Sequence, residues 1–354
     1  ADQTNLTLVN AFEIPQGETM ELNGDGGGTI DIGDNITLSG ILKLNAENNI
    51  ISGGKLIFND GLLDLDQDAS IESEILLRKN AGMDLSSGKK LSVTKSFEVP
   101  ENLKLEIAGN DGGSLSLTDT LKIEGTIQFS PPTVSSQINY HSMIDGKLEL
   151  SGGALLDVDY HTNIASNIKI SGNSTIDVAP DMTLTYSGDA IDVKSYQLTF
   201  LGTGTLQNSN AVLLSNSEGL IVFADDITVA LVKVEADSSS GKGIKVKSSG
   251  AKVTNLNMGA DLIVIFDSEQ YVFNIENLLV SSAATLSTEG SRGLVFITEL
   301  LQDNQDALLT LNNITAKVQE EIELSFKNQI VMTDSANFEV VGGLTFNLTG
   351  TMDF

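Results

Sequence analysis

The chain has 354 residues, with 20 Lys and Arg against 48 Asp and Glu, and hence a formal net charge of −28. Cysteine and tryptophan are absent, which excludes disulfide frameworks, zinc fingers, iron–sulfur clusters and thiol nucleophiles. The charge disfavours binding to nucleic acid or to an anionic membrane surface, and no apolar run reaches the roughly 18 to 20 residues of a membrane span.

Short runs in which apolar and polar residues alternate follow one another along the chain. They include residues 4–9, 29–32, 36–44, 55–58, 115–117, 121–129, 147–150, 167–170, 183–186, 197–201 and 344–348. A period of two predicts half-buried strands, and the Gly, Asn, Asp and Ser between the runs predict tight turns. We therefore expect an all-β chain of many short strands.

The first half of the chain contains an internal repeat. Residues 12–15 (FEIP) recur as residues 97–100 (FEVP), 97 − 12 = 85 positions later, and the match continues without gaps to Gly40 and Gly125. It then resumes with Gly54 and Gly146, 146 − 54 = 92 positions apart, so the second copy contains an insertion. We place this insertion in a surface loop at residues 130–136. A finer period of about twenty residues divides each copy.

Two architectures can produce such a repeat. One is a tandem of immunoglobulin-like β-sandwiches, and the other is a parallel β-helix, or β-solenoid, with rungs of about 20 residues. The solenoid fits better, because the chain has 13 Phe and 5 Tyr, only 5 Pro and no hinge-like linker. We predict a regular solenoid over residues 1–235 and a less regular continuation over residues 236–354.

The second half yields two local expectations. Residues 238–250 have the composition of an exposed loop that contains one short strand. Residues 300–323 are the one stretch where a helix competes, although the alternation at residues 309–311 and 322–324 indicates that strands resume there.

Short alternating strands, Gly and Asn corners, strong acidity and scarce proline together resemble the right-handed parallel β-helix passengers of bacterial surface and secreted proteins. These include adhesins of the filamentous haemagglutinin and autotransporter kind and, more distantly, pectate-lyase-like enzymes and phage tailspikes. The resemblance covers residues 6–235 most clearly and lies in the pattern rather than in a motif. It implies an extracellular or cell-surface location.

Paired aspartates form the first candidate site. Asp64 and Asp66 are two residues apart, so a strand places both carboxylates on one face, and Asp157 and Asp159 occupy the equivalent place in the second copy. Carboxylate oxygens are calcium ligands, which makes calcium the one candidate cofactor. The competing interpretation is a solvated acidic face that keeps the surface soluble.

A repeated Tyr-His dipeptide forms the second candidate site. Tyr140 and His141 recur as Tyr160 and His161, 160 − 140 = 20 positions later. Rungs of twenty residues would stack the two histidines about 4.8 Å apart, where they could bind a ligand or a metal. The competing interpretation is an ordinary aromatic stack.

The chain begins and ends in strand-like segments, residues 5–9 and 343–354, without a helical cap. Exposed strand edges invite pairing with another chain. The leading hypothesis is a non-enzymatic extracellular structural or adhesive protein that self-associates head to tail, as a homo-oligomer, into a filament, sheath or surface layer. The alternatives are a monomeric adhesin or carbohydrate-binding passenger that contacts surface glycans, and a polysaccharide-active enzyme.

Overall fold

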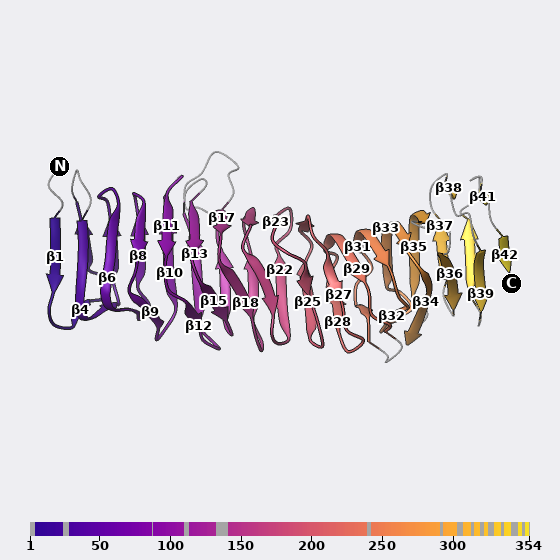
Figure 1. Cartoon of the computed structure of the whole chain (residues 1–354), viewed down its shortest axis with the longest axis horizontal. Coiled ribbons are helices and arrows are strands. Elements are labelled where there is room, and N and C mark those ends of the chain that lie inside the picture. The colour runs from indigo at the N-terminus through magenta and orange to yellow at the C-terminus, as the bar shows by residue number, and fades with distance from the viewer. Residues whose placement is uncertain are drawn as a thin grey trace. The chain divides into compact units, whose positions relative to one another are not determined.

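The chain is a parallel β-solenoid in the computed structural model (Figure 1). The structure describes residues 4–23, 28–86, 88–109, 113–131, 141–238, 242–290, 293–302, 307–312, 315–318, 322–324, 329–333, 336–340, 346–348 and 351–353. Across these residues every regular element is a strand, so there is no helix and none that could span a membrane. The predicted fold is confirmed, and the immunoglobulin-like alternative, which needs antiparallel sheets, is wrong.

The chain forms two compact units. The first comprises residues 1–172 and 182–188, and the second comprises residues 173–181 and 189–354. The division predicted at residue 235 concerned the regularity of the repeat and stays a prediction.

The first unit is built from three parallel ladders, in which each strand pairs with the equivalent strand of the next rung. The first ladder contains β1 (Thr4–Leu8), β4 (Gly28–Leu38), β6 (Asn49–Phe58), β8 (Ala69–Ile71), β11 (Lys90–Val93), β14 (Ser114–Leu117), β17 (His141–Ile144), β20 (Thr162–Ile164) and β23 (Thr183–Tyr186). The second contains β3 (Thr19–Leu22), β5 (Ile41–Leu44), β7 (Leu62–Leu65), β10 (Ala81–Leu85), β13 (Lys104–Ala108), β16 (Thr126–Phe129) and β19 (Leu155–Val158). The third ladder has two parts. The first part contains β2 (Phe12–Ile14), the later halves of β4 and β6, and β9 (Glu74–Leu77). The second part contains β12 (Phe97–Val99), β15 (Thr120–Ile123), β18 (Lys147–Leu150) and β21 (Asn167–Ile170).

The second unit repeats this construction. One ladder contains β22 (Ser174–Val178), β25 (Gln197–Gly202), β28 (Leu220–Phe223), β30 (Ile244–Val246), β32 (Leu262–Phe266), β34 (Ala283–Gly290), β36 (Leu308–Asn312), β39 (Gln329–Thr333) and β42 (Thr351–Asp353). The other contains β24 (Ile191–Asp192), β27 (Val212–Leu214), β29 (Thr228–Val234), β31 (Ala251–Met258), β33 (Val272–Val280), β35 (Leu294–Gln302), β37 (Thr315–Val318) and β40 (Asn337–Val340). In addition, β26 (Thr205–Asn208) pairs with β29, and β38 (Ile322–Leu324) pairs with β41 (Phe346–Leu348).

Stacked apolar side chains form the core of each unit. Alternate residues of most strands are buried, and the register places each buried residue over its equivalent in the next rung. One such column contains Leu42, Leu63, Met83, Ile107, Phe129 and Val158. In the second unit the rings of Phe200 and Phe223 lie 5.6 Å apart in successive rungs. Burial of these columns provides the main stabilising free energy, about 25 cal/mol per Å² of apolar surface.

The sequence repeat corresponds to one recurring corner. Gly40 and Gly125 each donate their N–H to the preceding rung, to the carbonyls of Ile14 and Val99 respectively. A Cβ on Gly40 would lie 2.3 Å from the Pro15 carbonyl oxygen, and one on Gly125 would lie 2.3 Å from the Pro100 oxygen. The two corners that the sequence repeat aligns therefore share their geometry.

Rungs are often longer than the predicted period. Leu62 pairs with Gly82, an offset of 82 − 62 = 20, whereas Ala81 pairs with Leu105, an offset of 105 − 81 = 24. Strand β30 lies within residues 238–250, as predicted. Strands β36 and β38 lie in the stretch where a helix competed, because alternation of apolar residues favours strands there. Residues 132–136 of the predicted insertion lie outside the described residues.

Candidate functional site

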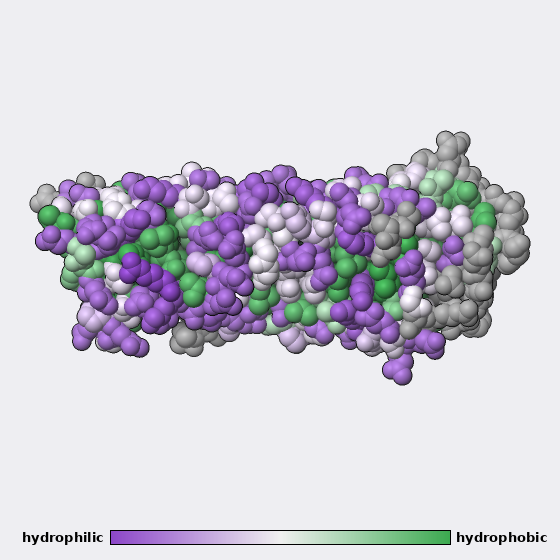
Figure 2. Space-filling model, turned by 90° about the horizontal axis from the view of Figure 1, so that it is seen from below, coloured by the Kyte–Doolittle hydropathy of each residue, from purple (hydrophilic) through white to green (hydrophobic). Residues whose placement is uncertain are grey.

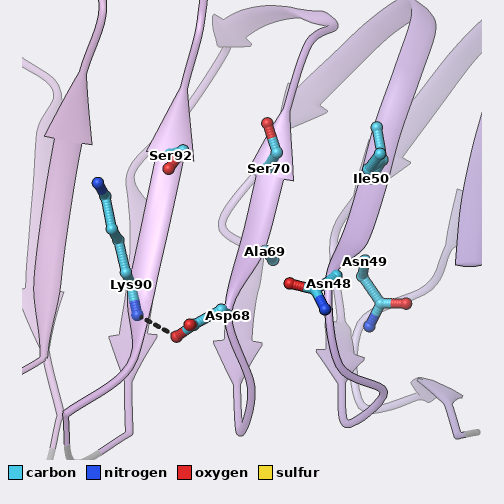
Figure 3. A pocket seen from close by; sticks show the side chains of 8 residues that line it. All are labelled: Asn48, Asn49, Ile50, Asp68, Ala69, Ser70, Lys90 and Ser92. Carbon is cyan, nitrogen blue, oxygen red and sulfur yellow. Dashed lines mark hydrogen bonds between the residues drawn. The ribbon is translucent and has the colours of Figure 1, made fainter. Parts of the chain in front are cut away.

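An open groove crosses three successive rungs of the first unit, at the starts of β6, β8 and β11 (Figure 3). Its volume is about 330 Å³. It is lined by Asn48, Asn49, Ile50, Asp68, Ala69, Ser70, Lys90 and Ser92. We refer to it as the polar groove.

The register aligns the lining residues of successive rungs. Ile50, Ser70 and Ser92 pair with one another across β6, β8 and β11 and form one row. Residues 48, 68 and 90 directly precede the paired residues Asn49, Ala69 and Leu91, so Asn48, Asp68 and Lys90 are neighbours along the lining of the groove. Parallel strands are about 4.8 Å apart, so the three rungs span about 10 Å.

Local backbone geometry fixes the groove. Asn48 adopts a left-handed conformation with a φ of 55°, which asparagine tolerates better than most residues do. The buried side chain of Asn49 donates its Nδ2–H to the Ala46 carbonyl at 2.9 Å and so ties down the corner. The Lys90 backbone N–H donates to Asp68 Oδ1 at 2.8 Å, drawn as a dashed line in Figure 3. The Lys90 side chain extends along its strand, away from Asp68.

A smaller depression of about 220 Å³ adjoins the groove. It is lined by Glu47, Asn48, Gln67, Asp68 and Lys89. The Lys89 ammonium donates to Gln67 Oε1 at 2.9 Å. Across the groove and this depression, Glu47 and Asp68 are balanced by Lys89 and Lys90, so the local formal charge is zero in a chain of charge −28.

The polar groove carries groups that can hydrogen-bond a polar ligand. Glycoside hydrolysis requires two carboxyl groups that flank the scissile bond. One carboxylate, Asp68, lines the groove, and its remaining polar groups are an ammonium, two amides and two hydroxyls. The adjoining depression adds a second carboxylate, Glu47.

The structure brings the first predicted aspartate pair together around a lysine. The Lys43 ammonium lies 3.3 Å from Asp64 Oδ2 and 2.9 Å from Asp66 Oδ2, so the two carboxylates do share a face. The hydrogen bond from Lys43 holds the pKa of Asp66 below its usual value. Burial raises the pKa of the neighbouring Asp84, and the charges of Asp64 and Asp66 raise it further.

The second predicted pair, Asp157 and Asp159, lies at β19, four strands along the same ladder from β7. That corresponds to about 19 Å, too far for all four carboxylates to hold one ion. Asp159 Oδ2 accepts a hydrogen bond of 2.6 Å from Gln128. In the part of the chain that the structure describes, no group of three or more His, Cys, Asp or Glu could hold a metal. Calcium binding by either pair stays a prediction.

The predicted histidine stack is wrong in register. His141 pairs with Thr162 rather than with His161, because the pairing offset of 162 − 141 = 21 exceeds by one the offset between the two histidines. The Tyr160 ring packs 5.3 Å from the His141 ring and 6.0 Å from the His161 ring. His161 Nδ1 accepts a hydrogen bond from the Thr183 backbone N–H at 3.1 Å. Tyr140 lies outside the described residues.

His141 is 1% exposed. Its Nε2 lies 3.0 Å from the Ser130 carbonyl oxygen, and its Nδ1 has no partner among the described residues. Burial lowers the pKa of this imidazole, although the hydrogen bond to Ser130 opposes the change. Burial therefore favours the neutral form of the ring. Ligand binding by Tyr140, His141, Tyr160 and His161 stays a prediction.

Sequence reasoning missed the polar groove. Its signal is present as three short polar segments at the rung period: residues 48–50 (NNI), 68–70 (DAS) and 90–92 (KLS). These segments differ in residue type, so a search for identical repeated residues passes over them. Only the register shows that they are neighbours.

No protein-family model, curated protein or solved structure matches this chain.

Proposed function

We propose that the chain is an extracellular or cell-surface structural and adhesive protein whose copies associate head to tail. The observation that carries the proposal is the edge of β1. Among the described residues, β1 pairs with β4, and a strand edge without a partner favours pairing with another chain. Val9 and Phe12 beside it are 74% and 39% exposed.

The sides of the solenoid disfavour association. In the third ladder of the first unit, Glu98, Lys122, Glu149 and Lys169 occupy one outward-facing row of alternating charge. Lys169 lies 2.7 Å from Glu149, and Lys122 lies 3.5 Å from Glu98. Figure 2 shows that hydrophilic residues predominate on the face it presents. The net charge of −28 opposes association of copies in every orientation. An attractive contact such as strand pairing at an edge is therefore needed to overcome this repulsion.

Substitutions in β1 test this proposal. Leu6 and Leu8 pair with the buried Ile30 and Ile32 and would lie under an incoming rung. We expect Leu6→Glu/Leu8→Glu to abolish association, because the new carboxylates would be buried at the contact. The matched control is Asn5→Glu/Thr7→Glu, which adds the same charge at exposed positions of the same strand.

Sedimentation velocity and electron microscopy measure the oligomeric state of the 354-residue chain and of both variants. The proposal predicts oligomers for the intact chain and the control, and monomers for the Leu6/Leu8 variant and for deletion of residues 1–9. An intact chain that stays monomeric at every concentration, or equal assembly of all variants, contradicts it.

The polar groove favours a second candidate function, a monomeric adhesin or carbohydrate-binding passenger. Its exposed amides, hydroxyls and charges are groups that hydrogen-bond sugars. Light scattering across a concentration series separates the two candidates: the mean mass rises with concentration in the first and stays at the monomer value in the second.

A further inference from the structure

The polar side chains of the groove have unused hydrogen-bonding capacity. Within the described ranges, the Ser70 and Ser92 hydroxyls, the Asn48 amide and the Lys90 ammonium have no protein partner. Asp68 uses Oδ1 for the Lys90 backbone N–H, and its Oδ2 has no protein partner there. Donors and acceptors therefore line a concave surface that crosses three rungs.

The spacing of these groups sets the size of a ligand. Three rungs place the backbones of the lining residues about 4.8 Å apart over about 10 Å, a length that suits two linked sugar rings. In Figure 3, Asn48 and Asp68 lie toward one end of the groove and Ser70 and Ser92 toward the other, and the Lys90 side chain extends along β11. Ile50 lies in the hydroxyl row and offers an apolar contact for the C–H groups of a ring.

Charge selects the class of saccharide. The groove and its adjoining depression are locally neutral, whereas the chain as a whole carries −28. A uronic-acid chain gains no net local attraction and is repelled by the rest of the surface. A neutral saccharide avoids this repulsion and hydrogen-bonds to the carboxylate, amide, ammonium and hydroxyls alike.

We propose that the polar groove binds a neutral, linear oligosaccharide that runs across the three rungs. This inference rests on the carbohydrate-binding candidate and is independent of head-to-tail association. The hydroxyls of one ring bridge Asn48 and Asp68, and those of the next contact Lys90 and Ser92. The groove is open and none of its eight lining residues is aromatic, so binding is weak, with a Kd of about a millimolar.

Titration with defined tetrasaccharides tests the proposal. The probes are maltotetraose, cellotetraose and laminaritetraose as neutral ligands and tetragalacturonate as the acidic one. Saturation-transfer NMR and isothermal titration calorimetry detect binding by the intact chain. The variants are Lys90→Ala, which removes an ammonium from the groove, and Ser92→Arg, which fills it. Thr120→Arg is the matched control, because Thr120 is half-buried on β15 in another ladder of the same unit.

We expect at least one neutral tetrasaccharide to bind and each groove variant to weaken it about tenfold or more, as expected for the loss of one or two hydrogen bonds. Thr120→Arg should bind like the intact chain. Circular dichroism and thermal melting check that Ser92→Arg is folded, and Lys90→Ala changes an exposed charge only.

Binding that survives both groove variants leaves the carbohydrate-binding candidate standing and overturns the groove as its site. Tighter binding of tetragalacturonate than of every neutral probe overturns the assignment to neutral saccharides. Absence of binding by all four probes at about 10 mM, roughly ten times the expected Kd, overturns both the groove assignment and the carbohydrate-binding candidate.

Discussion

At the scale of single residues, register decides what a side chain can do. The sequence places His141 and His161 twenty residues apart, and a rung of that length would superimpose them. The actual pairing of His141 with Thr162 moves the histidines out of register, and the Tyr160 ring packs against both instead. One additional residue in a rung thus converts a candidate ligand pair into a packed aromatic cluster.

The burial of His141 makes stability depend on pH. The unfolded chain protonates this histidine near pH 6.5, whereas burial lowers its pKa in the folded state. Between the two pKa values the unfolded state binds more protons, so the free energy of unfolding falls as the pH decreases below about 6.5. The stabilisation that comes from this histidine is fully present above that pH. Between the two pKa values the free energy of unfolding changes by up to about 1.4 kcal/mol per pH unit.

We expect His141→Gln to remove this component of the slope between pH 7.5 and pH 5.0, measured by urea unfolding and circular dichroism. The matched control is His161→Gln, which removes the only other histidine in the chain and should retain the slope. If His141→Gln and the intact chain lose stability in parallel over this range, the buried imidazole is not the cause.

At the scale of elements, the corners between strands restrict which residues can occupy them, as the strands do. Gly40 and Gly125 lie where the chain passes close to the preceding rung, and a Cβ on Gly125 would lie 2.2 Å from the Leu103 carbonyl oxygen. Backbone atoms cannot move aside as the end of a flexible side chain does. A side chain at either corner would therefore clash with the backbone of the preceding rung.

We expect Gly125→Ala and Gly40→Ala each to lower the free energy of unfolding by about 1 to 3 kcal/mol, as overpacking usually does. Gly152→Ala is the matched control, because nothing lies within 4 Å of its Cβ position and its φ is not positive. Its effect should stay within about 0.5 kcal/mol. Chemical unfolding of the three variants compares them, and equal stability of all three would show that the corners relax around a methyl group.

The strands, the fold and the repeat could be predicted from the sequence because a solenoid has a local signal. Alternation marks each strand, and stacked columns such as the one through Leu63 and Met83 leave a recurring aliphatic pattern. The polar groove could not be predicted in the same way. Its residues share no type, and the variable length of the rungs prevents a fixed period from aligning Asp68 with Lys90.

At the scale of the whole molecule, charge governs how copies approach one another. Each carries −28, so bringing two ends together is opposed by repulsion between the remaining surfaces. The contact proposed for β1 is a strand edge with apolar neighbours, Val9 and Phe12, and is itself insensitive to salt. The repulsion is screened as the Debye length falls from about 30 Å at 0.01 M to about 8 Å at 0.15 M.

We therefore expect head-to-tail association to strengthen with NaCl over this range. The mean mass from sedimentation should rise, and electron microscopy should show longer assemblies of unchanged width, because the exposed large apolar side chains among the described residues, Val9 and Phe12, lie beside β1. The Leu6→Glu/Leu8→Glu variant should stay monomeric at both salt concentrations. A mean mass that falls as salt is added would mean that ion pairs hold the contact together, and a width that grows with salt would place the contact on the sides of the solenoid instead of at β1.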